Sequence, residues 1–265
     1  MEINKNLIIQ KIDPVLTKGD GAITLVFLHY FGGDGGSWLW TIDELSKNYK
    51  CISLTLPGFG NTEPLKNKSV VHFAQWIADK LASLKVTNYI LCGHSMSGKL
   101  ALVTATLSTI KPKQLILIAP SPPTVEPMEA EEKERMLHHP AIREAETTVN
   151  KVTAKKLSAS QKEYAIISQL RIEHETWAWW IKQGMEDNIT TLIKDVNIPT
   201  TILVGENDPV IDMNLVQTEV LPYMPESQII VIKDSGHLIP MESISEVAST
   251  IHLIASKTNH IPSSH

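Results

Sequence analysis

The chain has 265 residues, of which 43% are hydrophobic and 20% are charged, and its formal net charge is −5. This composition excludes a disordered or fibrous protein, and the scattered basic residues under a negative net charge argue against a nucleic-acid partner. The two cysteines, Cys51 and Cys92, lie in apolar runs and are expected to be buried, reduced thiols. The N-terminus lacks a signal-peptide pattern and no run of about 18 apolar residues occurs, so we expect a cytoplasmic protein that does not span a membrane.

Short apolar runs alternate with helical patterns along most of the chain. The first residues, with a turn at Gly19-Asp20-Gly21, are expected to form an antiparallel hairpin that leads into a sheet. Runs rich in aliphatic and β-branched residues predict strands at 23–29, 51–56, 89–93, 114–119, 200–205 and 227–232. Helical patterns between them predict helices at 37–48, 70–85, 97–109, 213–222 and 241–256. The alternation indicates an α/β fold: a mostly parallel sheet with helices on both faces.

Residues 121–190 break this alternation. The segment opens with the proline-rich stretch SPPTVEP, continues with a charged helical pattern and ends with ETWAWWIKQGMED. We expect a helical cap at 121–190, inserted into a core formed by 1–120 and 191–265. Insertions at the carboxyl ends of parallel strands commonly bind ligands, so the cap is expected to cover the site. The last residues, SKTNHIPSSH, have the composition of a frayed polar tail.

Residues 90–102, ILCGHSMSGKLAL, hold two overlapping motifs between a predicted strand and a predicted helix. Gly93 to Lys99 nearly matches a nucleotide-binding P-loop. A P-loop needs a Ser or Thr hydroxyl for magnesium after its lysine, but Leu100 stands there. An acidic residue should also support the metal, and the strand at 114–119 ends in Ala-Pro-Ser. A P-loop NTPase is therefore the weaker interpretation.

The same stretch also nearly matches a nucleophile elbow centred on Ser95. An elbow needs small residues two positions away on either side, and Gly93 and Ser97 meet that need. The serine also needs a base and an acid that orients the base. Asp208 and His237 each follow a predicted strand further along the chain, in the order expected for this elbow. Glu206 is the alternative acid, closer to its strand.

The stretch LVFLHYFGGDGG places a glycine-rich loop directly after the first predicted parallel strand. Such a loop can present a backbone N–H to an oxyanion, beside the N–H of Met96.

These motifs together resemble the α/β-hydrolase superfamily over nearly the whole chain. The matching stretches are HYFGG (29–33), LPGFGNT (56–62), GHSMSG (93–98), GENDPV (205–210) and SGHLIPME (235–242). The resemblance implies an α/β-hydrolase fold with Ser95 as nucleophile, His237 as base and Asp208 as its orienting acid. It further implies that Phe31 and Met96 supply the oxyanion N–H groups. Three positions depart from the family pattern: Tyr30 and Ser97 stand where glycine is usual, and Thr55 stands where an Asp is common.

Other polar residues are expected to be structural. His29 and His94 are interpreted as packed, hydrogen-bonded neighbours of the site, and His138-His139 as a solvated helix end. Lys99 is expected to point outward into solvent. No metal and no cofactor is implied.

The tryptophans at the end of the cap admit two interpretations. They can simply pack helices, or Trp177 and Trp180, with Tyr30, can form the wall of a substrate pocket.

The leading hypothesis is a serine hydrolase that cleaves a small, fairly apolar carboxylic ester or lactone through an acyl-enzyme. Its partner is then a small-molecule substrate, and the sequence does not predict an oligomeric state. One alternative uses the same triad on a thioester, a carbon–carbon bond or a peroxide. Another is a ligand-binding receptor that keeps the triad with little turnover.

Overall fold

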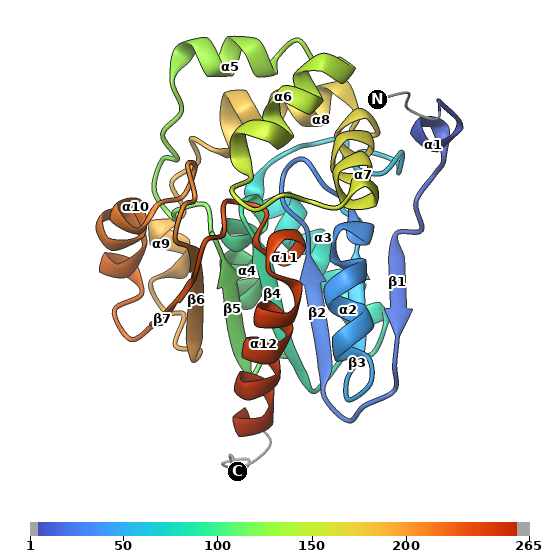
Figure 1. Ribbon diagram of the computed structural model, residues 1–265. Coiled ribbons are helices and arrows are strands. Elements are labelled where there is room, and N and C mark those ends of the chain that lie inside the picture. Colours follow the sequence, from blue (N-terminus) through green and yellow to red (C-terminus); the bar gives the residue numbers. More distant parts are fainter. Residues whose placement is uncertain (1–4, 259–265) are drawn as a thin grey trace.

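The computed structural model describes residues 5–258, and its centre is a seven-stranded sheet (Figure 1). Its strands run in the order β1-β3-β2-β4-β5-β6-β7. Strands β2 to β7 are parallel, and β1 is antiparallel to β3. The strands are β1 (Val15–Lys18), β2 (Thr24–Leu28), β3 (Lys50–Leu54), β4 (Tyr89–His94), β5 (Gln114–Ile118), β6 (Thr200–Gly205) and β7 (Gln228–Ile232). The six apolar runs thus formed strands within two residues of the predicted ends.

The expected N-terminal hairpin is wrong. β1 pairs with β3, with Val15 opposite Leu54, and not with β2, which follows it in the chain. Both edges of β2 are already occupied by β3 and β4, so the incoming strand passes to the free edge of β3. A local turn pattern predicts a change of direction but does not choose the pairing partner. The short helix α1 (Lys5–Ile9) precedes β1.

Helices cover both faces of the sheet. α2 (Leu39–Leu45), entered through the 3-10 turn η1 (Gly35–Trp38), and α12 (Ile244–Thr258) lie together on one face, while α3 (Val70–Ser83) and α4 (Met96–Leu107) cover the other (Figure 1). Two predicted helices are divided. The 213–222 pattern forms α10 (Met213–Leu215), the π-helical η3 (Val216–Val220) and η4 (Leu221–Tyr223), and the 241–256 pattern is split into α11 (Ile239–Glu242) and α12. Residues 256–258 end α12, and the rest of the predicted tail lies outside the described residues.

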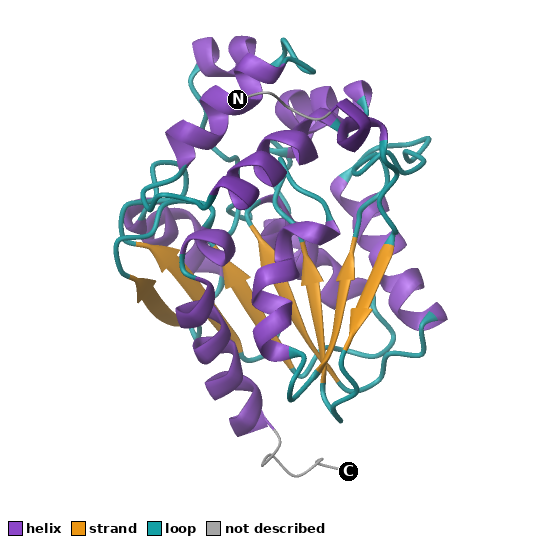
Figure 2. Ribbon diagram, turned by 45° about the vertical axis from the view of Figure 1, so that its right-hand side comes forward, coloured by secondary structure: helices purple, strands orange, loops and turns teal. Residues whose placement is uncertain are grey.

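Cap helices lie over the carboxyl ends of the parallel strands (Figure 2). Between β5 and β6 the chain forms α5 (Ala130–Met136), α6 (Ile142–Val152), α7 (Ala159–Leu170), α8 (His174–Trp179), the π-helical η2 (Trp180–Gly184) and α9 (Thr190–Ile193). A buried ion pair joins this segment to the sheet: Arg171, after α7, contacts Asp34, after β2, at 3.3 Å. Tyr164 on α7 also donates its hydroxyl hydrogen to Asp34. Because buried charges need close partners, these contacts hold α7 against the core.

Lys99 is buried, which contradicts the expectation that it points into solvent. Its Nζ donates hydrogen bonds to the carbonyl oxygens of Thr124, Met185 and Asp187, and it lies 5.9 Å from the centre of the Trp180 ring. The reason is that α4 packs against the sheet, α3 and α9, and every residue from Met96 to Ala105 is buried. A helix enclosed in this way has no solvent face for the lysine.

The structure confirms the predicted placement of the cysteines and corrects that of one histidine. Cys51 and Cys92 are both buried and free, as expected. His138 is exposed, but His139 is buried: its Nε2 donates to the Ile172 carbonyl oxygen at 2.9 Å and its ring stacks on Trp177 at 4.3 Å. The solvated helix end was therefore wrong for His139, because α8 packs over it. Within residues 5–258 no helix has the length and apolar character needed to cross a bilayer.

Candidate active site

Ser95 occupies the single position between β4 and α4. Its backbone has φ 54° and ψ −120°, a region that an L-residue adopts only under strain. The turn is possible because its neighbours are small: a Cβ on Gly93 would come within 2.3 Å of the Ser97 carbonyl oxygen, and one on Gly98 within 2.5 Å of Pro120. The strained turn lifts the hydroxyl above the sheet, as a nucleophile elbow does.

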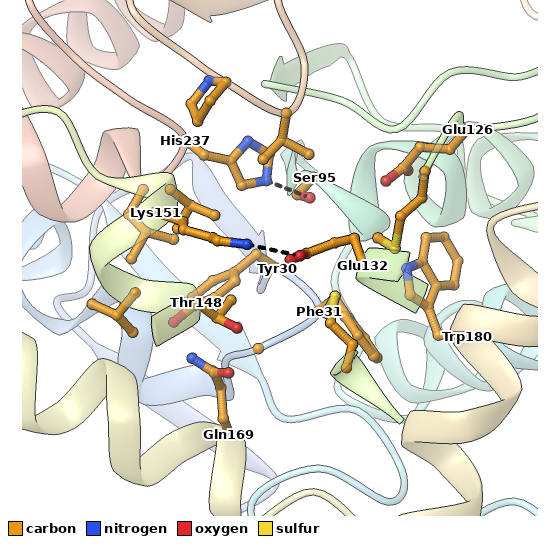
Figure 3. A pocket seen from close by; sticks show the side chains of 18 of the residues that line it. Tyr30, Phe31, Ser95, Glu126, Glu132, Thr148, Lys151, Gln169, Trp180 and His237 are labelled. Carbon is orange, nitrogen blue, oxygen red and sulfur yellow. Dashed lines mark hydrogen bonds and ion pairs between the residues drawn. The ribbon is translucent and has the colours of Figure 1, made fainter. Parts of the chain in front are cut away.

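Two downstream loops bring their side chains to Ser95. His237 follows β7, and its Nε2 lies 2.8 Å from the Ser95 Oγ (Figure 3). Its Nδ1 donates to Asp208 Oδ2, also at 2.8 Å, and Asp208 follows β6. The second carboxylate oxygen of Asp208 accepts the N–H groups of Val210 and Ile211. The three residues predicted from widely separated motifs thus form one continuous hydrogen-bonded chain.

Glu206, the alternative acid, does not reach the imidazole. Its carboxylate accepts the backbone N–H of Asp234 at 3.0 Å, on the exposed side of the same loop. The structure therefore places Asp208, and not Glu206, against His237.

The charges of the pair depend on each other. Burial favours the neutral imidazole, but the adjacent Asp208 carboxylate outweighs burial and raises the pKa of His237. Burial likewise opposes ionisation of Asp208, yet His237 and the two backbone N–H groups lower the pKa of that carboxyl below its ordinary value. The carboxylate is thus placed to stabilise a proton on His237.

Two further histidines position the site without titrating. Burial lowers the pKa of His94 to about 3 and that of His29 to about 4, so both rings are neutral. His94 donates through Nε2 to the His237 carbonyl oxygen at 2.8 Å, and therefore fixes the backbone of that residue. His29 donates through Nδ1 to the Tyr30 carbonyl oxygen and accepts the Leu56 N–H, which ties the loop after β2 to the loop after β3.

The loop after β2 faces the start of α4. The Ser97 hydroxyl donates to the His29 carbonyl oxygen and joins the two segments. In the loop, the Gly33 N–H bonds to the Tyr30 carbonyl oxygen, and the hydrogen bonds of the described residues assign no acceptor to the Phe31 N–H. The Met96 N–H begins α4 and has no intrahelical acceptor. Met96 directly follows Ser95, and Phe31 lines the same cavity as Ser95, so both predicted oxyanion donors belong to residues beside this site.

Tyr30, which stands where the family pattern has glycine, is buried in the same loop. Its ring lies 5.3 Å from the His94 ring, and a Cβ on Gly33 would meet it at 2.6 Å. The side chain fills the space under the loop and forms part of the cavity wall.

A cavity of about 580 Å³ lies between the cap and Ser95. Its walls include Tyr30, Trp177 and Trp180, and the Phe31 ring stacks on Trp177 at 4.2 Å between centroids. Tyr30, Trp177 and Trp180 therefore line the cavity. The sequence had left two interpretations of the tryptophans open, helix packing and a pocket wall. At the polar rim, the ammonium group of Lys151 on α6 pairs with the carboxylate of Glu132 on α5 at 2.9 Å (Figure 3). This ion pair links the two helices.

Glu242 was not singled out in the sequence, although it holds the histidine loop. Its carboxylate accepts the backbone N–H groups of Gly236 and Leu238, which flank His237. The same carboxylate accepts the N–H groups of Ala154 and Lys155 in the cap. In addition, the His237 N–H donates to the Val152 carbonyl oxygen at 2.7 Å. The cap and the histidine loop are thus hydrogen-bonded to each other. Glu242 is the last residue of the stretch SGHLIPME, of which the sequence-based prediction used only His237.

No group of three or more His, Cys, Asp or Glu side chains in the described part of the chain could hold a metal ion. The hydrogen bond from the Ser95 hydroxyl to His237 is the contact that can activate this hydroxyl as a nucleophile.

Comparisons with known proteins identify a family and a shared fold. A model of the alpha/beta hydrolase family matches residues 25–250. The dihydrolipoyllysine-residue acetyltransferase component of the acetoin cleaving system from Cupriavidus necator is 34% identical over 103 residues, which are 38% of this chain and 27% of that protein. The chain thus spans about a quarter of that protein's length. The pimeloyl-(acyl-carrier protein) methyl ester esterase from Nitrosomonas europaea is 23% identical over 83% of this chain and 90% of its own.

Among solved structures, an esterase from Exiguobacterium antarcticum has the same fold. It superposes with a TM-score of 0.82 at 16% identity, over 91% of this chain and 94% of its own.

Proposed function

The chain belongs to the alpha/beta hydrolase family, and on that premise we propose that it is a serine hydrolase that cleaves a small, fairly apolar carboxylic ester or lactone. The observation that carries the proposal is the hydrogen-bonded chain from Ser95 through His237 to Asp208, with its serine end at an apolar cavity. The names of the Nitrosomonas relative and the Exiguobacterium structure, both esterases, support the choice of an ester.

The proposed reaction has two steps, acylation of Ser95 and hydrolysis of the acyl-enzyme. Ser95 attacks the carbonyl carbon while His237 Nε2 takes its proton, and Asp208 stabilises the resulting imidazolium. The oxyanion accepts the N–H groups of Met96 and Phe31. His237 then gives its proton to the leaving alcohol, and the acyl group stays on Ser95. A water molecule, deprotonated by His237, attacks the acyl-enzyme, and His237 returns that proton to the Ser95 Oγ as the acid is released.

The cavity supports a substrate of modest size. Its volume lies within the range of about 300–1,000 Å³ that is usual for small-molecule sites. Aromatic and sulphur-containing side chains, among them Trp177, Trp180 and Met136, line it. We propose that such a small molecule, and not a nucleic acid, is the partner, and that the protein acts in the cytoplasm.

The test compares the wild type with Ser95→Ala on p-nitrophenyl butyrate and with a fluorophosphonate probe. We expect wild-type turnover and labelling, and a fall in kcat of roughly 10⁵–10⁶-fold without labelling in Ser95→Ala. Circular dichroism of both proteins controls for folding.

Parallel assays with thioesters, β-diketones and peracid formation separate the alternative reactions. Strong turnover of one of these without ester turnover would replace the ester proposal. A folded wild type that neither turns over nor labels would favour a receptor.

A further inference from the structure

Glu126 lies in the loop that links β5 to the cap, and its backbone is fixed. Its N–H donates to the Met185 carbonyl oxygen at 2.8 Å. Close by, the Ile189 N–H donates to the carbonyl oxygen of Pro123, so the loop is held along its length against the end of the cap. These two hydrogen bonds fix the backbone from which the Glu126 side chain extends.

The side chain points into the cavity of Ser95. Glu126 is 5% exposed and lines that cavity together with Ser95 and His237. Figure 3 shows its carboxyl group directed toward the Ser95 hydroxyl from the opposite side to His237. Its Oε2 is buried and has no hydrogen-bond partner among the described residues. A buried oxygen without a hydrogen-bond partner is unfavourable, so the protein itself leaves this carboxyl group incompletely satisfied.

The buried cation Lys99 does not form an ion pair with this carboxyl group. Lys99 is close enough to influence Glu126, but its Nζ donates to three backbone carbonyl oxygens instead. Burial raises the pKa of Glu126, against the opposing influence of Ser121, Lys99 and His237. The neutral acid is the form favoured by burial, and it can donate a hydrogen bond as well as accept one.

We propose that the carboxyl group of Glu126, in the wall of the Ser95 cavity, donates a hydrogen bond to a second oxygen of the substrate, a hydroxyl, ether or carbonyl oxygen outside the scissile ester. Glu126 thereby selects oxygen-bearing esters over all-carbon esters of the same length. The physical reason is asymmetric: an oxygen-bearing chain can hydrogen-bond to the carboxyl group in the cavity wall, whereas an alkyl chain covers that group and offers it no hydrogen bond. The inference rests on the proposed ester hydrolysis and narrows its substrate class.

The test uses p-nitrophenyl esters of one chain length, hexanoate and its analogues with oxygen in place of the methylene at position 3, 4 or 5. For each pair, the ratio of kcat/KM for the oxygen-bearing ester to that for hexanoate is compared among wild type, Glu126→Leu and Glu126→Gln. Intrinsic ester reactivity cancels, because the same pair is compared across variants. We expect the ratio for the preferred analogue to fall about 10-fold or more in Glu126→Leu and to stay within about 3-fold in Glu126→Gln, which keeps a donor.

Glu131, an exposed glutamate on α5, supplies the matched control. Glu131→Leu should leave every ratio unchanged. The inference is overturned if Glu126→Leu lowers both members of each pair equally or changes neither. It is also overturned if Glu126→Gln loses the preference as completely as Glu126→Leu, since the carboxyl would then act as a charged acceptor.

Binding separates this inference from the proposed reaction. In Ser95→Ala, Kd values are measured by calorimetry for the ketones that correspond to each ester pair, with and without Glu126→Leu. If the wild type shows no ester turnover but the ketone preference depends on Glu126, the recognition role stands and the reaction is wrong. If turnover is present and neither assay shows a preference that depends on Glu126, the recognition role is wrong.

Discussion

The hydroxyl of Ser97 donates a hydrogen bond to the carbonyl oxygen of His29 and so joins the helix after Ser95 to the loop opposite it. Met96 immediately precedes Ser97, and Phe31 lies two residues after His29. The bond therefore sets the spacing of the two N–H groups to which we assign the oxyanion. The serine that replaces the usual glycine has a geometric role that glycine could not supply.

Ser97→Ala tests that role. Loss of the hydroxyl leaves a buried carbonyl oxygen short of a donor, which costs about 1–3 kcal/mol. We expect Tm to fall by about 2–6 °C. We also expect kcat on p-nitrophenyl butyrate to fall roughly 10-fold with little change in KM, because a shifted donor mainly affects the transition state. Ser83→Ala, which removes an exposed hydroxyl at the end of α3, is the control. An unchanged kcat in Ser97→Ala would contradict the assigned role.

Asp208→Asn should reduce kcat by roughly 10⁴-fold, because an amide no longer holds the tautomer of His237 that accepts the serine proton. Glu206→Gln is the matched variant on the same loop. Since Glu206 contacts the Asp234 N–H and not the imidazole, we expect its kcat to stay within about 3-fold of wild type. Steady-state kinetics on one ester decides between them, and equal losses in the two variants would refute the assignment of the acid.

The pH dependence of kcat/KM follows from the charge on His237, which acts as a base only when neutral. Asp208 outweighs burial and raises the pKa of His237 above its ordinary 6.5. Activity should therefore fall as pH drops, with its midpoint above pH 6.5. In Asp208→Asn the raising influence is lost while burial remains, so the residual activity should have its midpoint at lower pH. A profile that is flat from pH 5 to 8, or one that shifts upward in the variant, would contradict this argument.

Glu242→Gln tests the link between the cap and the histidine loop. A neutral amide oxygen is a weaker acceptor for the four N–H groups that the carboxylate now satisfies. We expect Tm to fall by about 4–8 °C and kcat to fall about 10-fold. Faster proteolysis near Ala154 should accompany the loss. Glu246→Gln, exposed in the first turn of α12, should leave all three unchanged. Loss of stability without any change in kcat would limit Glu242 to a purely structural role.

The sequence predicted strands β2 to β6 well because almost all of their residues are buried on both faces of the sheet. A short, continuous apolar run such as TTILVG indicates a buried strand, and the predicted and observed bounds of β6 coincide. The division of 241–256 at Ser243 was not predictable in the same way, because apolar periodicity continues across the break. The pairing of β1 depends on which sheet edge is free, and that is a property of the assembled sheet.

The residues of the site also differ in how far the sequence could predict them. Ser95, Asp208 and His237 were found because each stands at a motif whose chemistry demands that residue type. Lys99 was misplaced and Glu126 was overlooked, since both depend on how the loop after β5 folds over α4. Burial of a charged side chain by a distant segment leaves no periodic pattern in the local sequence.

The hydrogen bonds that connect the cap with the histidine loop have a consequence for engineering. The cap cannot be exchanged as an independent module, because the backbone of His237 uses Val152 as its acceptor and the core supplies Asp34 to Arg171. A chimera that carries a foreign cap needs an acceptor at the end of its second helix and a cation facing Asp34. Grafts chosen only for the shape of their binding surface would leave the backbone of His237 without this acceptor.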